Sequence, residues 1–229
     1  MIPLRDSEST RRLTLMNTVL IAANLAVFGY ETELGKGAAA LIRRYAMTPA
    51  AITNAGGAAR EVRAPLTLVT SMFLHGGVLH VLGNMLYLFI FGPAVEERMG
   101  ARRYAIFYLA AGIAAGLATI AMGPDSRVGV IGASGAIAGV LGAYFVMYPR
   151  ARIMTILPLG FFIWTPEIPA VAYLLAWFAA QLWAGIAAGA QGPLVGGVAW
   201  WAHVGGFLFG VAIGPFAARA RPKSARRRR

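Results

Sequence analysis

The sequence lacks cysteine and is poor in charged residues. The absence of cysteine excludes disulfides and thiolate chemistry. Charged residues make up 13% of the 229 positions, whereas an ordinary soluble domain is about one quarter charged. Hydrophobic residues make up 58%, and the mean hydropathy is +0.63. This composition predicts an integral membrane protein rather than a soluble domain.

Acidic residues are also scarce, since 9 of them stand against 21 basic residues, for a net charge of +12. In a soluble chain this excess would suggest a nucleic-acid partner. Here the basic residues form short runs beside apolar stretches, which is typical of topology signals. We therefore expect membrane lipid and no nucleic acid as partner. The basic tail at 219–229 is interpreted as a cytoplasmic retention signal that could also attract anionic headgroups.

Long stretches without charge predict six membrane spans, because a helix needs about 20 apolar residues to cross a bilayer. The predicted spans are 13–30, 78–95, 104–123, 129–149, 168–189 and 198–217. The last two share one apolar stretch, with a turn expected at 188–197. Segment 153–166 is apolar but short and contains two prolines, which favours an interfacial or re-entrant piece. The predicted domains are a cytoplasmic segment at 1–12, a helical domain at 13–218 and the basic tail.

The distribution of basic residues predicts the orientation. With six spans and the N-terminus inside, 15 of the 21 basic residues are cytoplasmic and 6 are outside. A seventh span at 153–166 would put the basic tail outside, against the positive-inside rule. We therefore predict an all-α membrane protein with six spans and with both termini in the cytoplasm.

This topology brings four polar residues to one depth. Ser134, His203, His80 and Asn84 all fall roughly 5–10 Å below the outer boundary, at about 1.5 Å per helical residue. Polar side chains inside a membrane are costly and usually face the bundle interior or a water-filled cavity. Each one alone could be a packing residue, because a membrane serine often bonds its own i−4 carbonyl. Their shared depth favours a common site.

Glycine spacing predicts which helices meet. Gly132 and Gly135 begin a stripe along the fourth span, and Gly206 and Gly210 follow His203 in the sixth. Small residues let membrane helices approach closely, so we expect these two helices to pack and to bring Ser134 near His203. Membrane packing without any function would explain the glycines equally well.

A serine and a histidine are the minimum for nucleophilic acyl transfer. No acidic residue falls at their depth, which favours a dyad over a triad. Asn84, His80 and the backbone N–H of Ser134 are candidate oxyanion donors. The G-x-S-x-G and H-E-x-x-H motifs are absent. A metal site made from the three histidines remains an alternative, and neither a metal nor a cofactor is expected.

Four motifs give the chain a resemblance to the rhomboid intramembrane serine proteases. They are "FLHGGVLHVLGN", "AVEERMG", "GASGAIAGVLGAY" and "AHVGGFLFG". The resemblance implies that Ser134 is the nucleophile and His203 the general base, that Asn84 and His80 are oxyanion side chains, and that His75 is structural. It also implies a six-helix core that cuts transmembrane segments, with single-pass proteins as expected substrates. The site would open to the outer side of the cell (inner) membrane.

One departure concerns Ala138, where many relatives have an aromatic residue beneath the catalytic histidine. Other packing must then hold His203. Two alternatives to a protease are a catalytically silent rhomboid-like protein that binds client helices and a small transporter. A silent relative usually lacks the serine or the histidine, and both are present here. A transporter would favour charged groups at the midplane, and the sequence has none there.

Overall fold

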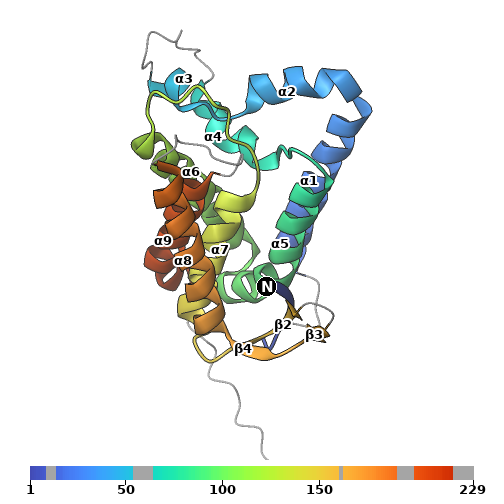
Figure 1. Cartoon of the computed structure of the whole chain (residues 1–229), viewed down its shortest axis with the longest axis vertical. Coiled ribbons are helices and arrows are strands. Elements are labelled where there is room, and N and C mark those ends of the chain that lie inside the picture. The colour runs from blue at the N-terminus through green and yellow to red at the C-terminus, as the bar shows by residue number, and fades with distance from the viewer. Residues whose placement is uncertain (9–13, 54–63, 160–161, 190–198, 219–229) are drawn as a thin grey trace, which may run out of the picture.

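The computed structural model describes residues 1–8, 14–53, 64–159, 162–189 and 199–218. Its α-helices are α1 (Leu15–Glu33), α2 (Ala38–Tyr45), α3 (Pro49–Thr53), α4 (Thr67–Thr70), α5 (Val78–Met99), α6 (Ala101–Met122), α7 (Ser134–Met147), α8 (Ala170–Gly189) and α9 (Trp200–Ala217). Its strands are β1 (Ile2–Asp6), β2 (Arg152–Leu159), β3 (Phe162–Trp164) and β4 (Glu167–Pro169). The long helices run along the long axis of the molecule, with α2 and α3 at one end and the strands at the other (Figure 1).

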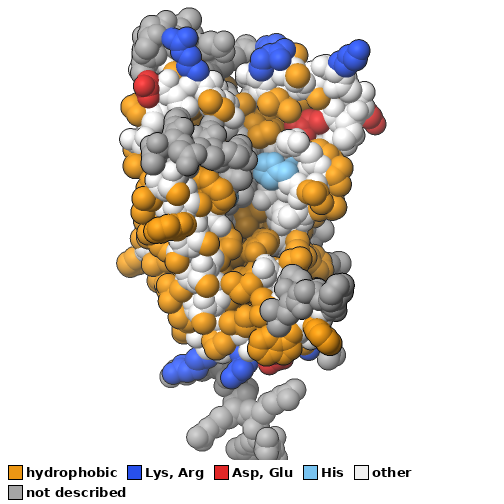
Figure 2. Space-filling view, viewed as in Figure 1, with side chains coloured by type: hydrophobic (Ala, Val, Ile, Leu, Met, Phe, Trp, Pro, Cys, Tyr) orange, Lys and Arg blue, Asp and Glu red, His pale blue; other side chains and the backbone are white. Residues whose placement is uncertain are grey.

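Within the described residues, four helices are long and apolar enough to cross a membrane: α5, α6, the Ala170–Ala187 part of α8, and α9. Side chains are mainly hydrophobic along the middle of the molecule, and the basic side chains lie at its two ends (Figure 2). The chain is therefore an integral membrane protein. α7 is only 14 residues long, and α1 buries Asn17, Asn24 and Glu31. The six-span topology and its orientation stay predictions.

The prediction of an all-α protein is wrong in one respect, because the chain also forms a small sheet. β2 pairs antiparallel with β1, β3 and β4, so that the first residues of the chain lie beside 152–156. β2 and β3 occupy the apolar segment 153–166. The described residues of this segment form strands rather than a crossing helix, and its interfacial or re-entrant placement stays a prediction.

The predicted span at 129–149 is also longer than the helix found there. α7 begins at Ser134, and a non-helical segment precedes it, in which Val130 is bridged to Met47. Gly132 causes the change of direction because its φ of 117° is one that residues with a side chain rarely adopt. Helix α5, by contrast, starts at Val78, where the predicted span 78–95 begins.

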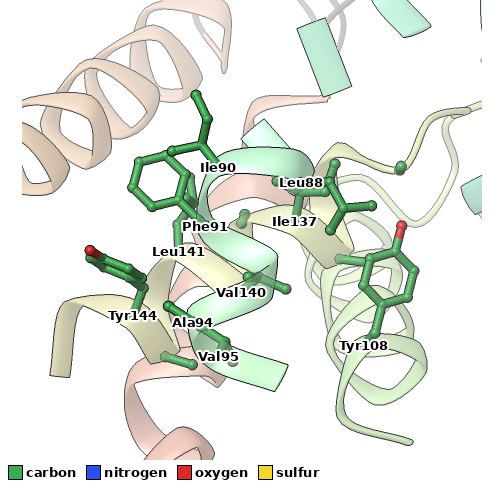
Figure 3. Close-up of a cluster of buried hydrophobic side chains, with 14 of the residues drawn as sticks. Leu88, Ile90, Phe91, Ala94, Val95, Tyr108, Ile137, Val140, Leu141 and Tyr144 are labelled. Atoms are coloured by element: carbon green, nitrogen blue, oxygen red, sulfur yellow. The ribbon is translucent and has the colours of Figure 1, made fainter. Parts of the chain in front are cut away.

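The core lies where α5, α6 and α7 meet. Figure 3 shows Leu88, Phe91 and Ala94 of α5 in one cluster with Ile137, Leu141 and Tyr144 of α7. Phe91 is fully buried and makes an edge contact with the Tyr144 ring at a centroid distance of 5.1 Å. This core fixes α7, which carries the predicted nucleophile at its first residue.

The turn predicted at 188–197 and the basic tail at 219–229 lie largely or wholly outside the described residues. Most of the predicted segment 1–12 is described, and it contributes β1. The predicted domain boundaries stay predictions.

Candidate active site

Ser134 is the first residue of α7, at the point where an extended segment becomes a helix. The N–H of Gly132 donates to the carbonyl of Ser71 over 2.9 Å and holds this entry in place. The first N–H groups of a helix have no partner within it and carry a partial positive charge. The side chain and the backbone N–H of Ser134 therefore lie at an end of a helix that favours a negative charge.

His203 lies in the first turn of α9 and is 9% exposed. Its Nε2 is 2.8 Å from Oγ of Ser134, which is hydrogen-bonding distance. The sequence predicted that these two residues meet, and the structure brings them together. The pair has the geometry that a nucleophile and its general base require.

Glycines set the distance between the two helices that carry the pair. A Cβ on Gly206 of α9 would lie 2.1 Å from the carbonyl oxygen of Gly135 of α7. One turn further, a Cβ on Gly210 would lie 2.0 Å from the carbonyl oxygen of Gly139. The backbones are therefore in direct contact at positions where only glycine fits, as the two stripes predicted.

Gln181 of α8 contacts the other side of the His203 ring. Its Oε1 is 2.8 Å from Nδ1 of His203. The rings of Trp177 and Trp200 also lie near the imidazole, at centroid distances of 6.0 and 6.2 Å. Sequence reasoning missed Gln181. The available signal was a polar residue alone within the apolar stretch 168–189.

His80 of α5 points its second ring nitrogen toward Gly132. The N–H of Gly76 donates to Nδ1 of His80 over 3.3 Å. A neutral imidazole that accepts at Nδ1 carries its proton on Nε2. A Cβ on Gly132 would lie 2.7 Å from this Nε2, so the donor faces the segment that leads into Ser134.

Asn84 of α5 presents a second donor at the same place. Its Nδ2 is buried and, among the residues that the structure describes, has no hydrogen-bond partner. It would lie 3.6 Å from a Cβ on Gly132. An acceptor that enters the cavity can therefore take a hydrogen bond from this amide. His80 and Asn84 thus converge beside Ser134, as their shared depth predicted.

His75 lies just before α5 and supports the site from behind. Its backbone N–H lies 3.2 and 3.3 Å from the two carboxylate oxygens of Glu31, and its ring contacts His80 edge-on at 5.1 Å. Burial, and secondarily the nearby His80, lowers the pKa of His75 to about 4. A neutral, buried ring that packs behind His80 fits the structural role that the resemblance implied.

A cavity of about 580 Å³ joins these residues. Ser134, His203, Gln181, His80 and Asn84 line it, together with mainly apolar side chains from α5 to α9. Figure 2 shows a hollow on one face of the molecule with a histidine side chain at its edge. Within the described part of the chain, no three His, Cys, Asp or Glu side chains group closely enough to hold a metal ion.

A family model described as "Rhomboid domain" matches residues 63–220. The chain is 28% identical over 172 residues to "Rhomboid protein 1, mitochondrial" of Saccharomyces cerevisiae, covering 73% of this chain and 46% of that protein. It is 39% identical over 93 residues to "Rhomboid protease GluP" of Bacillus subtilis, covering 41% and 18%.

A third relative is "RHOMBOID-like protein 1" of Arabidopsis thaliana, which is 32% identical over 148 residues, covering 64% of this chain and 33% of that protein. The chain thus spans less than half the length of these three curated relatives. The family model, however, covers well over half of the chain, including both α7 and α9. The chain belongs to the rhomboid family.

Proposed function

We propose that the chain is an intramembrane serine endopeptidase that hydrolyses peptide bonds in or near transmembrane segments of membrane proteins. The observation that carries the proposal is the 2.8 Å contact between Oγ of Ser134 and Nε2 of His203, inside a cavity that also holds two side-chain donors. Family membership supports it, since one relative bears the name rhomboid protease.

The hydrogen bonds of His203 determine which of its ring nitrogens carries the proton. Gln181 Oε1 accepts from Nδ1–H, so the lone pair of the neutral ring lies on Nε2, which faces Ser134. In the first step Nε2 takes the proton of the Ser134 hydroxyl while Oγ bonds to the carbonyl carbon of the substrate. The carbonyl electrons move onto the oxygen and create an oxyanion.

The oxyanion would be held by donors already aimed at it. Nε2–H of His80, Nδ2 of Asn84 and the N–H of Ser134 all lie beside Gly132. Because these donors are fixed before reaction, they stabilise charge that appears only in the transition state. The C–N bond then breaks, and the leaving amine takes the proton from Nε2 of His203.

The resulting ester on Ser134 is hydrolysed by the same proton transfers, with water as the nucleophile. His203 removes a proton from a water molecule, whose oxygen attacks the ester carbonyl. The Ser134–acyl bond breaks, Oγ recovers the proton from Nε2, and a carboxylic acid leaves. No cofactor takes part in these steps.

The substrates that fit this setting are membrane proteins, with single-pass proteins proposed first. The cavity is bounded by helices of membrane-spanning length and has mostly apolar walls, which suits an apolar chain segment. We place the chain in the cell (inner) membrane with six spans, including α1 and α7, and with the cavity opening to the outer face. The excess of basic residues assigned to the inner segments supports this orientation.

Fluorophosphonate labelling tests the chemistry. The wild type should be labelled, and both Ser134→Ala and His203→Ala should lose labelling. Ser71 lines the same cavity, so Ser71→Ala is the matched control and should keep it. Cleavage of a single-pass substrate should follow the same order. Labelling that survives Ser134→Ala would refute the assignment, and substrate retention without fragments would favour a silent client-binding protein.

The orientation has its own test, because the chain contains no cysteine. Asp125→Cys and Glu97→Cys each place a single thiol at an exposed position, at opposite ends of the bundle. In intact cells a membrane-impermeant maleimide should label the first and not the second. The opposite pattern would reverse the proposed orientation.

A further inference from the structure

Gln181 is a polar residue of α8 that forms or breaks no covalent bond in the proposed reaction. Apart from Tyr173, whose hydroxyl is hydrogen-bonded to that of Tyr87, the remaining described residues of α8 are apolar side chains or glycine. The exposed face of α8 includes Leu175, Trp183 and Ile186. A polar side chain inside an apolar membrane helix is unfavourable unless it is hydrogen-bonded. The partner of Gln181 is Nδ1 of His203, at 2.8 Å.

We propose that Gln181 is the positioning residue of His203. Gln181 takes the place of the acidic residue of a catalytic triad, and Trp177 takes the place of an aromatic residue on α7. This inference rests on the proposed function. Gln181 and Trp177 are four residues apart, so they project from the same face of α8. One contacts the edge of the imidazole through a hydrogen bond, and the other packs near its ring.

The first role concerns the tautomer. A neutral imidazole carries one proton, and only the form with the proton on Nδ1 leaves Nε2 free to accept from Ser134. Oε1 of Gln181 accepts a hydrogen bond from that Nδ1–H, so the bond selects the reactive form. An amide performs this selection without a buried negative charge, which would be costly at this depth.

The second role concerns the ring plane. Ala138 of α7 is fully buried, and its Cβ would lie 3.3 Å from a Cβ on Gly206. The tight contact of α7 with α9 therefore leaves no room for an aromatic side chain at 138. Trp177 contacts the ring from α8 instead, at 38° to its plane, and it also packs on Phe207 one turn after His203.

His80 Nδ1 offers a contrast within the same cavity. It accepts a hydrogen bond from the Gly76 N–H, whereas His203 Nδ1 faces an acceptor. The two rings are therefore held in opposite tautomers, one as a donor toward Gly132 and one as an acceptor toward Ser134. The different neighbours of Nδ1 thus make His80 a hydrogen-bond donor to the oxyanion and make His203 the base.

Gln181→Met tests the inference, because methionine has a similar length and is only a weak acceptor. We expect kcat on a single-pass substrate to fall about 10-fold, in line with the loss of one buried hydrogen bond, with KM changed less than 2-fold. Gln181→Glu, whose carboxyl is neutral when it is buried at this depth, keeps an acceptor oxygen and should recover most of the lost kcat. Leu175→Met is the matched control, since it places the same side chain on the exposed face of α8.

A spectroscopic measurement does not depend on activity. The chain has three histidines, so ¹⁵N-histidine NMR of the full detergent-solubilised chain resolves few signals, and His203→Ala identifies the one from position 203. The wild type and Ser134→Ala should both carry the His203 proton on Nδ1, and Gln181→Met should give a mixture of tautomers. The melting temperature of each variant is measured alongside.

The outcomes separate the inference from the proposed function. A wild type that fluorophosphonates do not label would refute the function, whatever the tautomer. A labelled wild type with the His203 proton on Nε2, or a folded Gln181→Met variant with wild-type kcat and an unchanged tautomer, would refute the role of Gln181. If Gln181→Met does not fold, failure of Gln181→Glu to retain kcat while folded would also refute it.

Discussion

The carbonyl oxygen of Gly135 occupies the space that a side chain on Gly206 would need, since a Cβ there would lie 2.1 Å from it. Gly206 is three residues after His203, and Gly135 directly follows Ser134. One of the backbone contacts between the two helices therefore lies one turn or less from the pair of proposed reacting atoms. The distance between Ser134 and His203 is set by the backbone packing rather than by the two side chains alone.

Gly206→Ala should consequently impair both the reaction and stability. The new methyl group must push α9 away from α7, and a displacement of about 1 Å at reacting groups can cost about 10²-fold in rate. Overpacking should also lower the free energy of unfolding by about 1–3 kcal/mol. The rate of fluorophosphonate labelling and the melting temperature in detergent measure the two effects.

Gly29→Ala is the matched control for this substitution. Gly29 lies in α1, and a Cβ there would have no neighbour within 4 Å. Alanine is favoured over glycine within a helix by about 1 kcal/mol, so this variant should be neutral or slightly stabilised. Equal losses in both variants would show that the helix contact does not govern the site.

Asn84→Ala and His80→Ala test the oxyanion donors. Each substitution removes one fixed donor that acts on charge in the transition state, so kcat should fall about 10²–10³-fold with little change in KM. Steady-state cleavage of a single-pass substrate measures both constants. A raised KM with an unchanged kcat would mean that these side chains bind substrate instead of stabilising the oxyanion.

The sequence predicted this much of the site because depth in a membrane follows from counting residues. Ser134, His203, His80 and Asn84 could be placed at one level, and the glycine stripes indicated which two helices meet. The contact of Gln181 with His203 could not be predicted from the sequence, because it depends on the rotation of α8 about its own axis. That rotation is decided by packing against α9, as in the stacking of Phe178 on Phe207 at 4.8 Å.

The sheet could not be predicted from the sequence for a different reason. β1 is only five residues long, and its partner β2 is more than 140 residues away in the chain, so no local pattern links them. The buried hydroxyl of Tyr144 donates to a carboxylate oxygen of Asp6 over 2.7 Å and ties β1 to α7. A contact of this kind is specified by three-dimensional neighbours, whereas the apolar length of a span is written directly in the sequence.

Ala138→Phe should not improve the support of His203, although relatives often have an aromatic residue there. Ala138 is fully buried beside Gly206, so the larger side chain would overpack the contact of α7 and α9 and cost about 1–3 kcal/mol or more. The melting temperature and the labelling rate should both fall. Ala176→Phe, at an exposed position of α8, should leave both unchanged. A faster Ala138→Phe variant would contradict this account.

Glu96→Gln should destabilise the fold without altering the reaction. The two carboxylate oxygens of Glu96, near the end of α5, accept from the N–H groups of Met16 at 3.0 Å and Asn17 at 2.6 Å, in the first turn of α1. Glutamine keeps one acceptor and loses both the second and the negative charge that favours a helix N-terminus. Because hydrogen bonds to charged groups contribute about this much, the free energy of unfolding should fall by about 1–2 kcal/mol. The value of kcat should stay within 2-fold.

The neighbouring Glu97 provides the control for that measurement. It is exposed, and Glu97→Gln makes the same chemical change one residue away, where surface substitutions usually shift stability by less than about 0.5 kcal/mol. Thermal unfolding of both variants in the same detergent measures the difference. If the two variants melt together, the carboxylate of Glu96 does not hold α1 against α5. If Glu96→Gln instead lowers kcat at unchanged stability, α1 is coupled to the site, and the hydrogen bonds of Glu31 to His75 are then the contact through which that coupling would run.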